Sequence, residues 1–282
     1  MDTVIQAGII GLIQGLTEFI PVSSSAHLEI VPWVFGWDSE DGIIGTLAFD
    51  VFLHLGTLVA LLVYFFRDWL RYIGAWFASV RDRRIGDDPD RRIAWLLLIA
   101  TIPAAVIGFL LEGFIEETFH GDSDAARLAI AGFLVIGGAL LYAADRFGRR
   151  AREMDDISAT AAMTIGFTQA LALLPGISRS GATLSAGLAL GLKREAAARF
   201  SFLLATPITF GAGLYGSRRL FDESLTQTEW LAIGVGFVAA AVSGLLAIGF
   251  LLAWLRRRSV AVFSLYRVGF AFLIVALVVF RG

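Results

Sequence analysis

The chain has 282 residues, of which 57% are hydrophobic and 17% charged, and its mean hydropathy is +0.75. Several apolar stretches are long enough to cross a hydrocarbon core of about 30 Å, and most lack the polar face of a soluble core helix, so the composition indicates a polytopic helical membrane protein. The net charge of −2 gives no support for a nucleic-acid partner, and the absence of cysteine excludes disulfides, thiolate metal sites and cysteine nucleophiles.

The first apolar stretch, residues 4–20, is interrupted halfway across a membrane. Pro21 and a run of serines follow it, and the next apolar piece, residues 28–35, is short. Two short helices around a polar break are typical of a re-entrant hairpin, which is tolerated at membrane depth only where protein or water satisfies its backbone. Complete spans are then predicted at residues 48–66, 93–111 and 127–144.

The second half of the chain repeats this plan. It begins with an apolar stretch (159–174), a polar break (175–183) and a second apolar stretch (184–192). Three predicted spans follow, at residues 196–216, 229–254 and 260–280. Gly11, Gln14 and Ser23 align with Gly166, Gln169 and Ser178 at one constant offset. Coincidence among small apolar residues is the alternative, but the shared layout favours duplication.

The predicted architecture is therefore one all-α membrane domain over residues 1–282, with six transmembrane helices and two re-entrant helix hairpins. Its two repeats cover about 1–146 and about 159–281. Each repeat has an odd number of complete spans, so the second must be inverted relative to the first. Inverted repeats with broken helices usually place their ligand at mid-membrane, where the breaks converge.

The distribution of arginine predicts the orientation. Residues 67–92 form an Arg-rich loop, residues 145–158 carry further arginines, and residues 112–126 are acidic. By the positive-inside rule, the two basic segments lie in the cytoplasm and the acidic one outside.

The first break concentrates polar side chains where hydrocarbon would disfavour them. Gln14 and Glu18 are four residues apart and so project from one helix face. They could act as an interhelical hydrogen-bond pair that stabilises the bundle. A carboxylate inside a membrane is nevertheless a functional-site hypothesis by default, as a base or as a metal ligand. His27 ends a run that contains Ser23 and Ser24, and two readings stay open for it: a hydrogen bond to a backbone carbonyl, or part of a proton-transfer or nucleophile unit.

One further pair of ionisable residues, Asp50 and His54, lies inside a predicted span. Structural and functional roles for these two residues stay equally open.

The second break predicts an anion site. Ser178 or Ser180 can cap the helix that follows, and Gly181 allows a tight turn. The free N–H groups at that helix start, the hydroxyls including Thr183, and the guanidinium of Arg179 together suit a phosphate, which Arg can bind bidentately. The alternative is a capped loop whose arginine extends to the membrane interface.

The motifs of the two polar breaks, residues 14–27 and 175–183, together resemble one family. Gln14-Gly-Leu-Thr-Glu18, the Pro21-Val-Ser-Ser run that ends at His27, and Pro175-Gly-Ile-Ser-Arg-Ser-Gly-Ala-Thr183 are similar to the bacitracin-resistance family of undecaprenyl-diphosphate phosphatases. The resemblance covers nearly the whole chain, and the pair of motifs is highly specific. It implies six spans and two re-entrant hairpins in inverted repeats, and as site residues it implies Glu18, Ser24, His27, Ser178, Arg179 and Thr183.

The resemblance also implies an activity. The expected enzyme is a multi-pass phosphatase of the plasma membrane that converts undecaprenyl diphosphate to undecaprenyl phosphate and phosphate. It would recycle the lipid carrier for envelope glycans, confer bacitracin resistance and have a site that opens to the outer side. Expected partners are the lipid substrate, membrane lipids and a second copy in a homodimer. The carrier itself stays open between undecaprenyl and a dolichol-type lipid.

Within that expectation, Arg179 and the amides of residues 178–183 hold the diphosphate, and the nucleophile is Ser24, His27 or a water. A divalent cation, Mg²⁺ or Ca²⁺, would suit the chemistry with Glu18 as one ligand, since Mg²⁺ prefers one or two carboxylates plus substrate phosphates. Gln14 and Ser23 are further substrate-binding candidates, together with Ser180 and Gly181. A transporter or flippase for a polyprenyl phosphate is the alternative function, because such carriers also use inverted repeats with broken helices.

Two positions depart from the family pattern. Gln14 stands where the family often has Glu, so Glu18 must be the only carboxylate of its motif. Ala26 precedes His27 where glycine is common, which tightens the steric limits of the turn.

Overall fold

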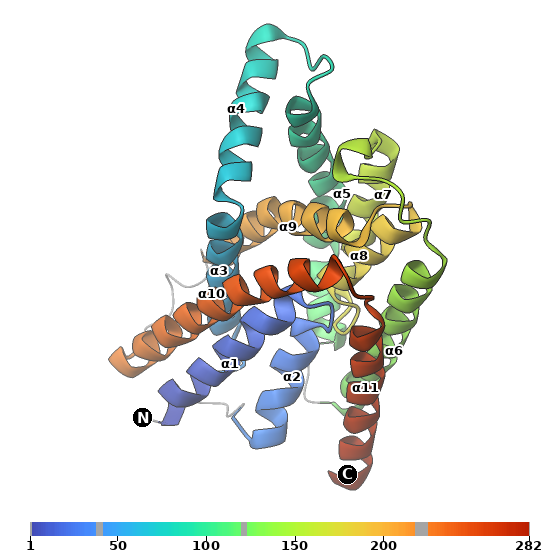
Figure 1. Ribbon diagram of the computed structural model, residues 1–282. Helices are drawn as coiled ribbons and strands as arrows, with labels where there is room; N and C mark the ends of the chain where they lie inside the picture. Colours follow the sequence, from blue (N-terminus) through green and yellow to red (C-terminus); the bar gives the residue numbers. More distant parts are fainter. Residues whose placement is uncertain (1, 38–41, 120–122, 218–224, 282) are drawn as a thin grey trace.

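The computed structural model describes residues 2–37, 42–119, 123–217 and 225–281. These residues are almost entirely helical, with one isolated β-bridge between Arg152 and Leu192. Figure 1 shows the helices in chain order: α1 (Asp2–Phe19), α2 (Ser24–Phe35), α3 (Leu47–Tyr64), α4 (Phe66–Asp82), α5 (Pro89–Phe119), α6 (Asp124–Phe147), the 3₁₀ turn η1 (Met154–Asp156), α7 (Ala159–Gln169), the 3₁₀ turn η2 (Ala170–Leu173), α8 (Arg179–Ala189), α9 (Arg194–Ser217), α10 (Gln227–Leu255) and α11 (Ala261–Arg281).

Within the described residues, six helices are long and apolar enough to cross a membrane: α3, α5, α6, α9, α10 and α11. They coincide with the six spans predicted from hydropathy, so the prediction of an all-α polytopic membrane protein is confirmed. The largest difference is at α5, which continues to Phe119 and so takes up part of the segment predicted as an outer acidic loop. Residues 120–122 of that loop lie outside the described part of the chain.

Both polar breaks have the same local geometry. α1 ends at Phe19 and α2 begins at Ser24, whereas α7 and η2 end at Leu173 and α8 begins at Arg179. The residue before each new helix is a serine with positive φ, 78° at Ser23 and 69° at Ser178. Non-glycine residues rarely adopt that conformation. Each serine caps its helix by accepting a hydrogen bond from a backbone N–H three residues later.

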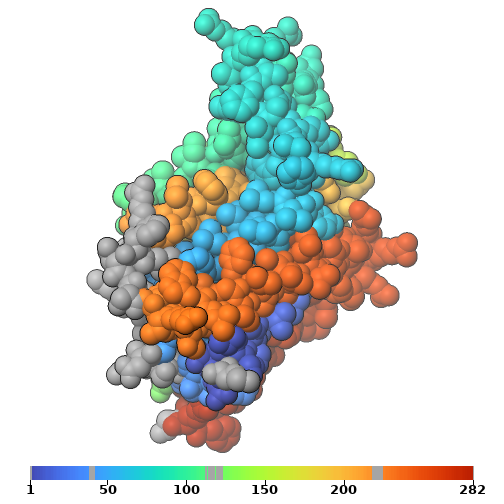
Figure 2. Space-filling model, turned by 90° about the vertical axis from the view of Figure 1, so that its left-hand side faces the viewer, coloured from blue at the N-terminus to red at the C-terminus, as the bar shows by residue number. Residues whose placement is uncertain are grey.

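The two halves also exchange their first helices. α1 packs along α10, and α7 packs along α5, at a pair of close glycine contacts. A Cβ atom on Gly11 would collide with the carbonyl oxygen of Gly236, and a Cβ atom on Gly166 would collide with that of Ala100. Figure 2 shows α10 lying across the molecule beside α1. The packing is thus reciprocal between the two halves; the duplication, the inverted orientation and the re-entrant path of the hairpins stay predictions.

The Arg-rich segment, predicted as a loop over residues 67–92, is largely the helix α4. In Figures 1 and 2, α4 and the start of α5 rise above the remainder of the molecule. Trp95 Nε1 donates to Ser79 Oγ at 2.9 Å, and Arg91 Nη2 donates to Asp82 Oδ2 at 2.8 Å. Hydrogen bonds from Arg91 and Arg81 lower the pKa of the Asp82 carboxyl.

Aromatic packing fixes the end of α1, where the first break begins. Phe19 is 1% exposed and meets Phe202 of α9 edge to face, with ring centroids 5.4 Å apart. Phe202 in turn packs against Phe65, at the end of α3. Because Phe19 is held in this way, the preceding residue, Glu18, projects toward α3 and α8.

Candidate active site

The carboxylate of Glu18 is the centre of the site. Its side chain is only 5% exposed, and donors from both sides of the first break surround it. Ser24 Oγ donates to Glu18 Oε2 at 2.6 Å, and Gln14 Nε2 donates to the same oxygen at 3.2 Å. The break brings Ser24 back onto the last turn of α1, so a hydroxyl and a carboxylate six residues apart become hydrogen-bonded.

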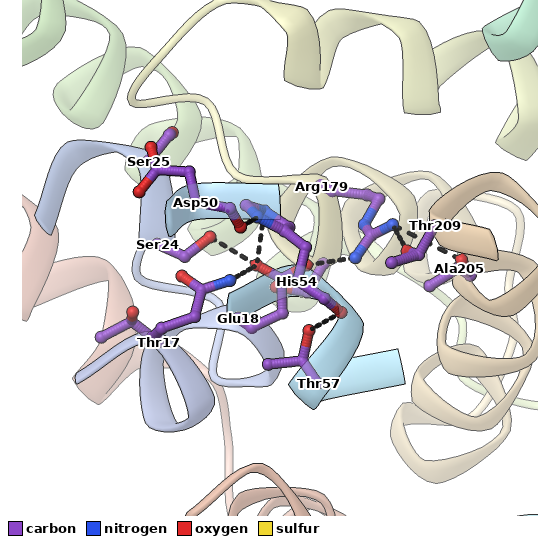
Figure 3. Close-up of polar contacts among 12 residues, drawn as sticks. Thr17, Glu18, Ser24, Ser25, Asp50, His54, Thr57, Arg179, Ala205 and Thr209 are labelled. Carbon is purple, nitrogen blue, oxygen red and sulfur yellow. Dashed lines mark hydrogen bonds and ion pairs between the residues drawn. The ribbon is translucent and has the colours of Figure 1, made fainter. Parts of the chain in front are cut away.

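Arg179 reaches this carboxylate from the second break. Its Nη2 forms an ion pair with Glu18 Oε1, while its Nη1 donates to Thr209 Oγ1 and, at 3.5 Å, to the carbonyl oxygen of Ala205. Figure 3 shows the guanidinium between Glu18 on one side and α9 on the other. Two segments that the sequence predicted to meet are therefore in direct contact.

A second hydrogen bond joins the breaks, from the backbone of one to a serine hydroxyl of the other. Gly176 N–H donates to Ser25 Oγ at 3.4 Å, and Ser25 Oγ lies 3.2 Å from Ser23 Oγ. Ser178 and Ser180 form the corresponding hydroxyl pair of the second break, also at 3.2 Å. The paired hydroxyls give each break the same short polar turn.

Two of the residues predicted to bind substrate make contacts that support the start of α8, and their role in binding stays a prediction. The Thr183 hydroxyl donates to the carbonyl oxygen of Arg179 at 2.8 Å and lies against Ser201 Oγ of α9. Gly181 lies against Arg267, whose guanidinium a Cβ atom at that position would contact at 2.7 Å. Both residues hold the start of α8 in place, which in turn places Arg179.

His27, predicted as a catalytic residue, is turned toward α11. Its Nδ1 lies 2.7 Å from the carbonyl oxygen of Ser23, and its Nε2 lies 2.7 Å from the Tyr266 hydroxyl. The ring stacks on Phe270 with centroids 4.4 Å apart and is 5% exposed. Both ring nitrogens therefore have protein partners away from Glu18, and a direct role in the chemistry stays a prediction.

A different histidine occupies the position beside the carboxylate. His54 Nε2 lies 3.9 Å from Glu18 Oε2, and His54 Nδ1 lies 2.8 Å from the carbonyl oxygen of Asp50, one turn earlier on α3 (Figure 3). Its side chain is 39% exposed, far more than that of Glu18. The sequence had left the role of His54 open.

Two residues of the site were missed from the sequence. Thr209 is a hydroxyl-bearing residue in a predicted span, and its spacing from other polar residues does not indicate a functional role. Arg267 is fully buried in α11, where its Nη2 donates to the carbonyl oxygens of Gly176 at 2.7 Å and Ile177 at 2.8 Å. An arginine inside an apolar span could have been recognised as a signal, because a buried charge requires partners.

The donors around Glu18 do not suit a resident metal ion. Glu18 Oε1 accepts from a guanidinium, and Oε2 accepts from a hydroxyl and an amide N–H. A cation bound to either oxygen would therefore meet hydrogen-bond donors, one of them positively charged. No cluster of three or more His, Asp or Glu side chains arranged for a metal ion occurs in the described part of the chain. The divalent cation stays a prediction, and the oxygens of a diphosphate substrate would have to supply most of its ligands.

The arrangement has the parts required for phosphoryl transfer. A hydroxyl that donates to a carboxylate is a nucleophile with an adjacent proton acceptor. A guanidinium at the same carboxylate can stabilise the charge that develops on a transferring phosphoryl group. Together they form a serine–carboxylate–arginine unit, defined here as Ser24, Glu18 and Arg179.

Comparison with known proteins identifies the family. The family model described as "Bacitracin resistance protein BacA" matches residues 7–273. A protein of Desulforudis audaxviator named undecaprenyl-diphosphatase is 46% identical over 274 residues, which cover 97% of each chain. Proteins of the same name from Thermomicrobium roseum and Rubrobacter xylanophilus are 42% and 43% identical over 277 residues, covering 98% of this chain and 98% and 99% of theirs. The chain belongs to the BacA family of bacitracin resistance proteins.

Proposed function

We propose that this protein is an integral membrane phosphatase that hydrolyses undecaprenyl diphosphate, or a related polyprenyl diphosphate, to the monophosphate and phosphate. The observation that carries the proposal is the hydrogen bond from Ser24 Oγ to Glu18 Oε2, at the carboxylate that also pairs with Arg179. The relatives named undecaprenyl-diphosphatase, which align over nearly the full chain, support the choice of substrate.

The first step transfers the terminal phosphoryl group to the enzyme. Ser24 Oγ attacks the terminal phosphorus, its proton passes to Glu18 Oε2, and the bond from phosphorus to the bridging oxygen breaks. The polyprenyl monophosphate leaves with that oxygen. Arg179 binds the non-bridging oxygens and neutralises charge in the transition state.

The second step releases phosphate. Water attacks the phosphorus of the phosphorylated Ser24, and the bond from phosphorus to Oγ breaks. Ser24 Oγ then recovers the proton that Glu18 held, which restores the enzyme.

The same hydrogen bond disfavours transport as the sole activity. A carrier for a polyprenyl phosphate would need the anion contacts of Arg179, but it has no use for a hydroxyl held at 2.6 Å from a buried carboxylate. Hydrolysis uses both features. The location we propose is the plasma membrane, with the site opening to the outer side, where hydrolysis would recycle the lipid carrier and confer bacitracin resistance.

Phosphate release from undecaprenyl diphosphate by the purified protein in detergent tests the proposal. Ser24→Ala and Glu18→Gln should each lower kcat by about 10²-fold or more, because general-base activation of a nucleophile contributes about 10²–10⁴-fold. Ser185→Ala is the matched control, since the Ser185 hydroxyl donates only to the carbonyl oxygen of Gly181 in its own helix. Wild-type turnover by both site variants would contradict the proposed site.

A further inference from the structure

The mechanism proposed above leaves one ionisable neighbour of the carboxylate without a role. His54 Nε2 lies 3.9 Å from Glu18 Oε2, the same oxygen that accepts the hydrogen bond from Ser24. This gap is wider than a hydrogen bond, so the imidazole stands beside the pair and is not bound to it. Figure 3 shows His54 projecting from α3 toward Glu18.

The other ring nitrogen determines what Nε2 can do. A carbonyl oxygen can only accept, so the contact of 2.8 Å with the carbonyl of Asp50 requires the proton on Nδ1. In the neutral ring, Nε2 therefore carries the lone pair, and this lone pair is on the side of the ring that faces Glu18. His54 is held as a hydrogen-bond acceptor at the site.

The water that attacks in the second step gives up a proton, and such an acceptor can take it. When water attacks the phosphorylated Ser24, Glu18 already holds the serine proton, and Gln14, the other polar neighbour of Glu18, cannot accept one. Asp50 contributes its carbonyl to His54. The side chain of His54 is 39% exposed and that of Glu18 is 5% exposed, so the protein leaves more of the imidazole than of the carboxylate uncovered.

We propose that His54 is a catalytic residue, the general base that takes the proton of the attacking water. The oxygen of this water bonds to the phosphorus while its proton moves to His54 Nε2. The bond between the phosphorus and Ser24 Oγ breaks, and Oγ receives the proton from Glu18. The proton on His54 then leaves with phosphate or passes to solvent. This inference depends on the proposed phosphatase activity and assigns the base for its second step.

Other titratable groups near His54 come from several helices. α10 packs against α3 and carries one titratable side chain, Glu229, in its first turn next to Trp230, which meets Phe52 of α3; α4 begins beyond the far end of α3. The groups on the surrounding elements are Glu18 on α1, Asp50 on α3, Arg67 and Asp68 on α4, Arg179 on α8, and Arg194, Glu195, Arg199 and Tyr215 on α9. Asp68 pairs with Arg71 and Arg199, and Arg179 pairs with Glu18.

Two substitutions separate the base from a structural role. In His54→Asn, the side-chain amide replaces Nδ1 and keeps the donor to the Asp50 carbonyl, but the base is lost. In His54→Gln, the amide extends toward the position of Nε2 and is equally unable to accept a proton. Both variants are purified in detergent beside the wild type, with size-exclusion elution and thermal unfolding as checks on folding.

Each variant is assayed with undecaprenyl diphosphate that carries ³²P in the terminal phosphoryl group. Both should lower kcat roughly 100-fold, as is common when a general base is removed. Both should also accumulate acid-stable label on the protein, because the second step becomes the slow one. The pH profile of kcat in both variants should also differ from that of the wild type, because the general base is missing.

Thr57→Val is the matched control on the same helix. Thr57 Oγ1 donates to the carbonyl oxygen of His54, so the substitution disturbs α3 one turn away and removes no proton acceptor from the site. It should keep wild-type turnover and pH dependence. Labelled protein should disappear when Ser24→Ala is added to either His54 variant.

The inference is overturned if the folded His54→Asn variant turns over at the wild-type rate, or if both variants are slow with an unchanged pH profile and no label. A wild-type protein that releases no phosphate from undecaprenyl diphosphate would instead contradict the proposed function, which is a separate outcome.

Discussion

The guanidinium of Arg179 meets three acceptors that lie in two directions. Glu18 is on one side, and Thr209 and the carbonyl of Ala205 are on the other. A planar group with several N–H donors can satisfy this geometry, whereas an ammonium group, which is a compact point charge, cannot span it. The side chain is therefore fixed in position before it meets a phosphate.

Arg179→Lys should consequently behave as a severe substitution, although it keeps the charge. We expect kcat/KM for undecaprenyl diphosphate to fall about 100-fold or more, because one preorganised donor set is worth about 3–4 kcal/mol in the transition state. Phosphate release over a range of substrate concentrations measures this. A loss smaller than about threefold would mean that charge alone is needed at this position.

Thr209 positions this arginine from α9, and its contribution should be measurable. Thr209→Val keeps the shape and removes the hydroxyl, so kcat/KM should fall roughly tenfold, in line with about 1.5 kcal/mol for a hydrogen bond to a charged group. Thr209→Ser should restore activity.

Thr206→Val is the matched control, because the Thr206 hydroxyl donates to the carbonyl oxygen of Phe202 in its own helix. Equal losses in Thr206→Val and Thr209→Val would attribute the effect to α9 as a whole and contradict the positioning role.

The residues of the site differ in how far the sequence predicts them. Glu18 and Arg179 are conspicuous because a charge in an apolar stretch needs a reason. The direction in which a side chain points is a tertiary property, and it separates His27 from His54. His27 follows the hydroxyl run but faces α11, whereas His54 is distant in sequence but faces Glu18. Thr209 carries no charge and gives no signal in a span.

At the scale of the element, the two breaks carry different residue types at the corresponding position, the first residue of the following helix. Ser24 is the first residue of α2, after the cap residue Ser23, and Arg179 is the first residue of α8, after the cap residue Ser178. The offset that aligns Gly11 with Gly166 also aligns Ser24 with Arg179. The predicted duplication would thus have contributed a nucleophile candidate from one copy and a candidate anion-binding residue from the other.

The close glycine contacts of α1 and α7 predict a stability effect. Gly11→Ala and Gly166→Ala would each push a methyl group into a backbone carbonyl of the neighbouring helix, so each should destabilise the protein by about 1–3 kcal/mol. The thermal unfolding midpoint in detergent measures this effect.

Gly234→Ala on α10 is the control, since nothing lies within 4 Å of a Cβ atom there. Alanine is favoured over glycine in a helix by about 1 kcal/mol, so the midpoint of this variant should stay the same or rise. Similar losses in all three variants would contradict the close-packing explanation.

Element type and boundaries were predictable wherever hydropathy is continuous, which accounts for the six spans. The helix α4 was not predictable in this way, because its arginines and aspartates lower the mean hydropathy of the segment. Its Trp76 and Ser79 nevertheless pack against Trp95 of α5. The packing of α1 on α10 could not be predicted either, since spacing along the chain does not specify which distant helix a glycine will meet.

At the scale of the whole molecule, the orientation in the membrane is directly testable because the chain has no cysteine. Asp87→Cys, between α4 and α5, should react with a membrane-impermeant maleimide only after the cells are permeabilised. Ala125→Cys, at the start of α6, should react in intact cells. The physical reason is the retention of arginine-rich segments on the cytoplasmic side. Labelling of Asp87→Cys in intact cells would reverse the predicted topology.

The exchange of first helices between the halves has a consequence for biosynthesis. The ribosome completes α1 early, but the glycine-rich groove of α10 that receives it emerges only near the end of translation. During that interval Gln14 and Glu18 have neither Arg179 nor α10 beside them. The N-terminal helix is therefore synthesised long before its packing partner, and the Glu18 carboxylate acquires its final surroundings among the last events of assembly.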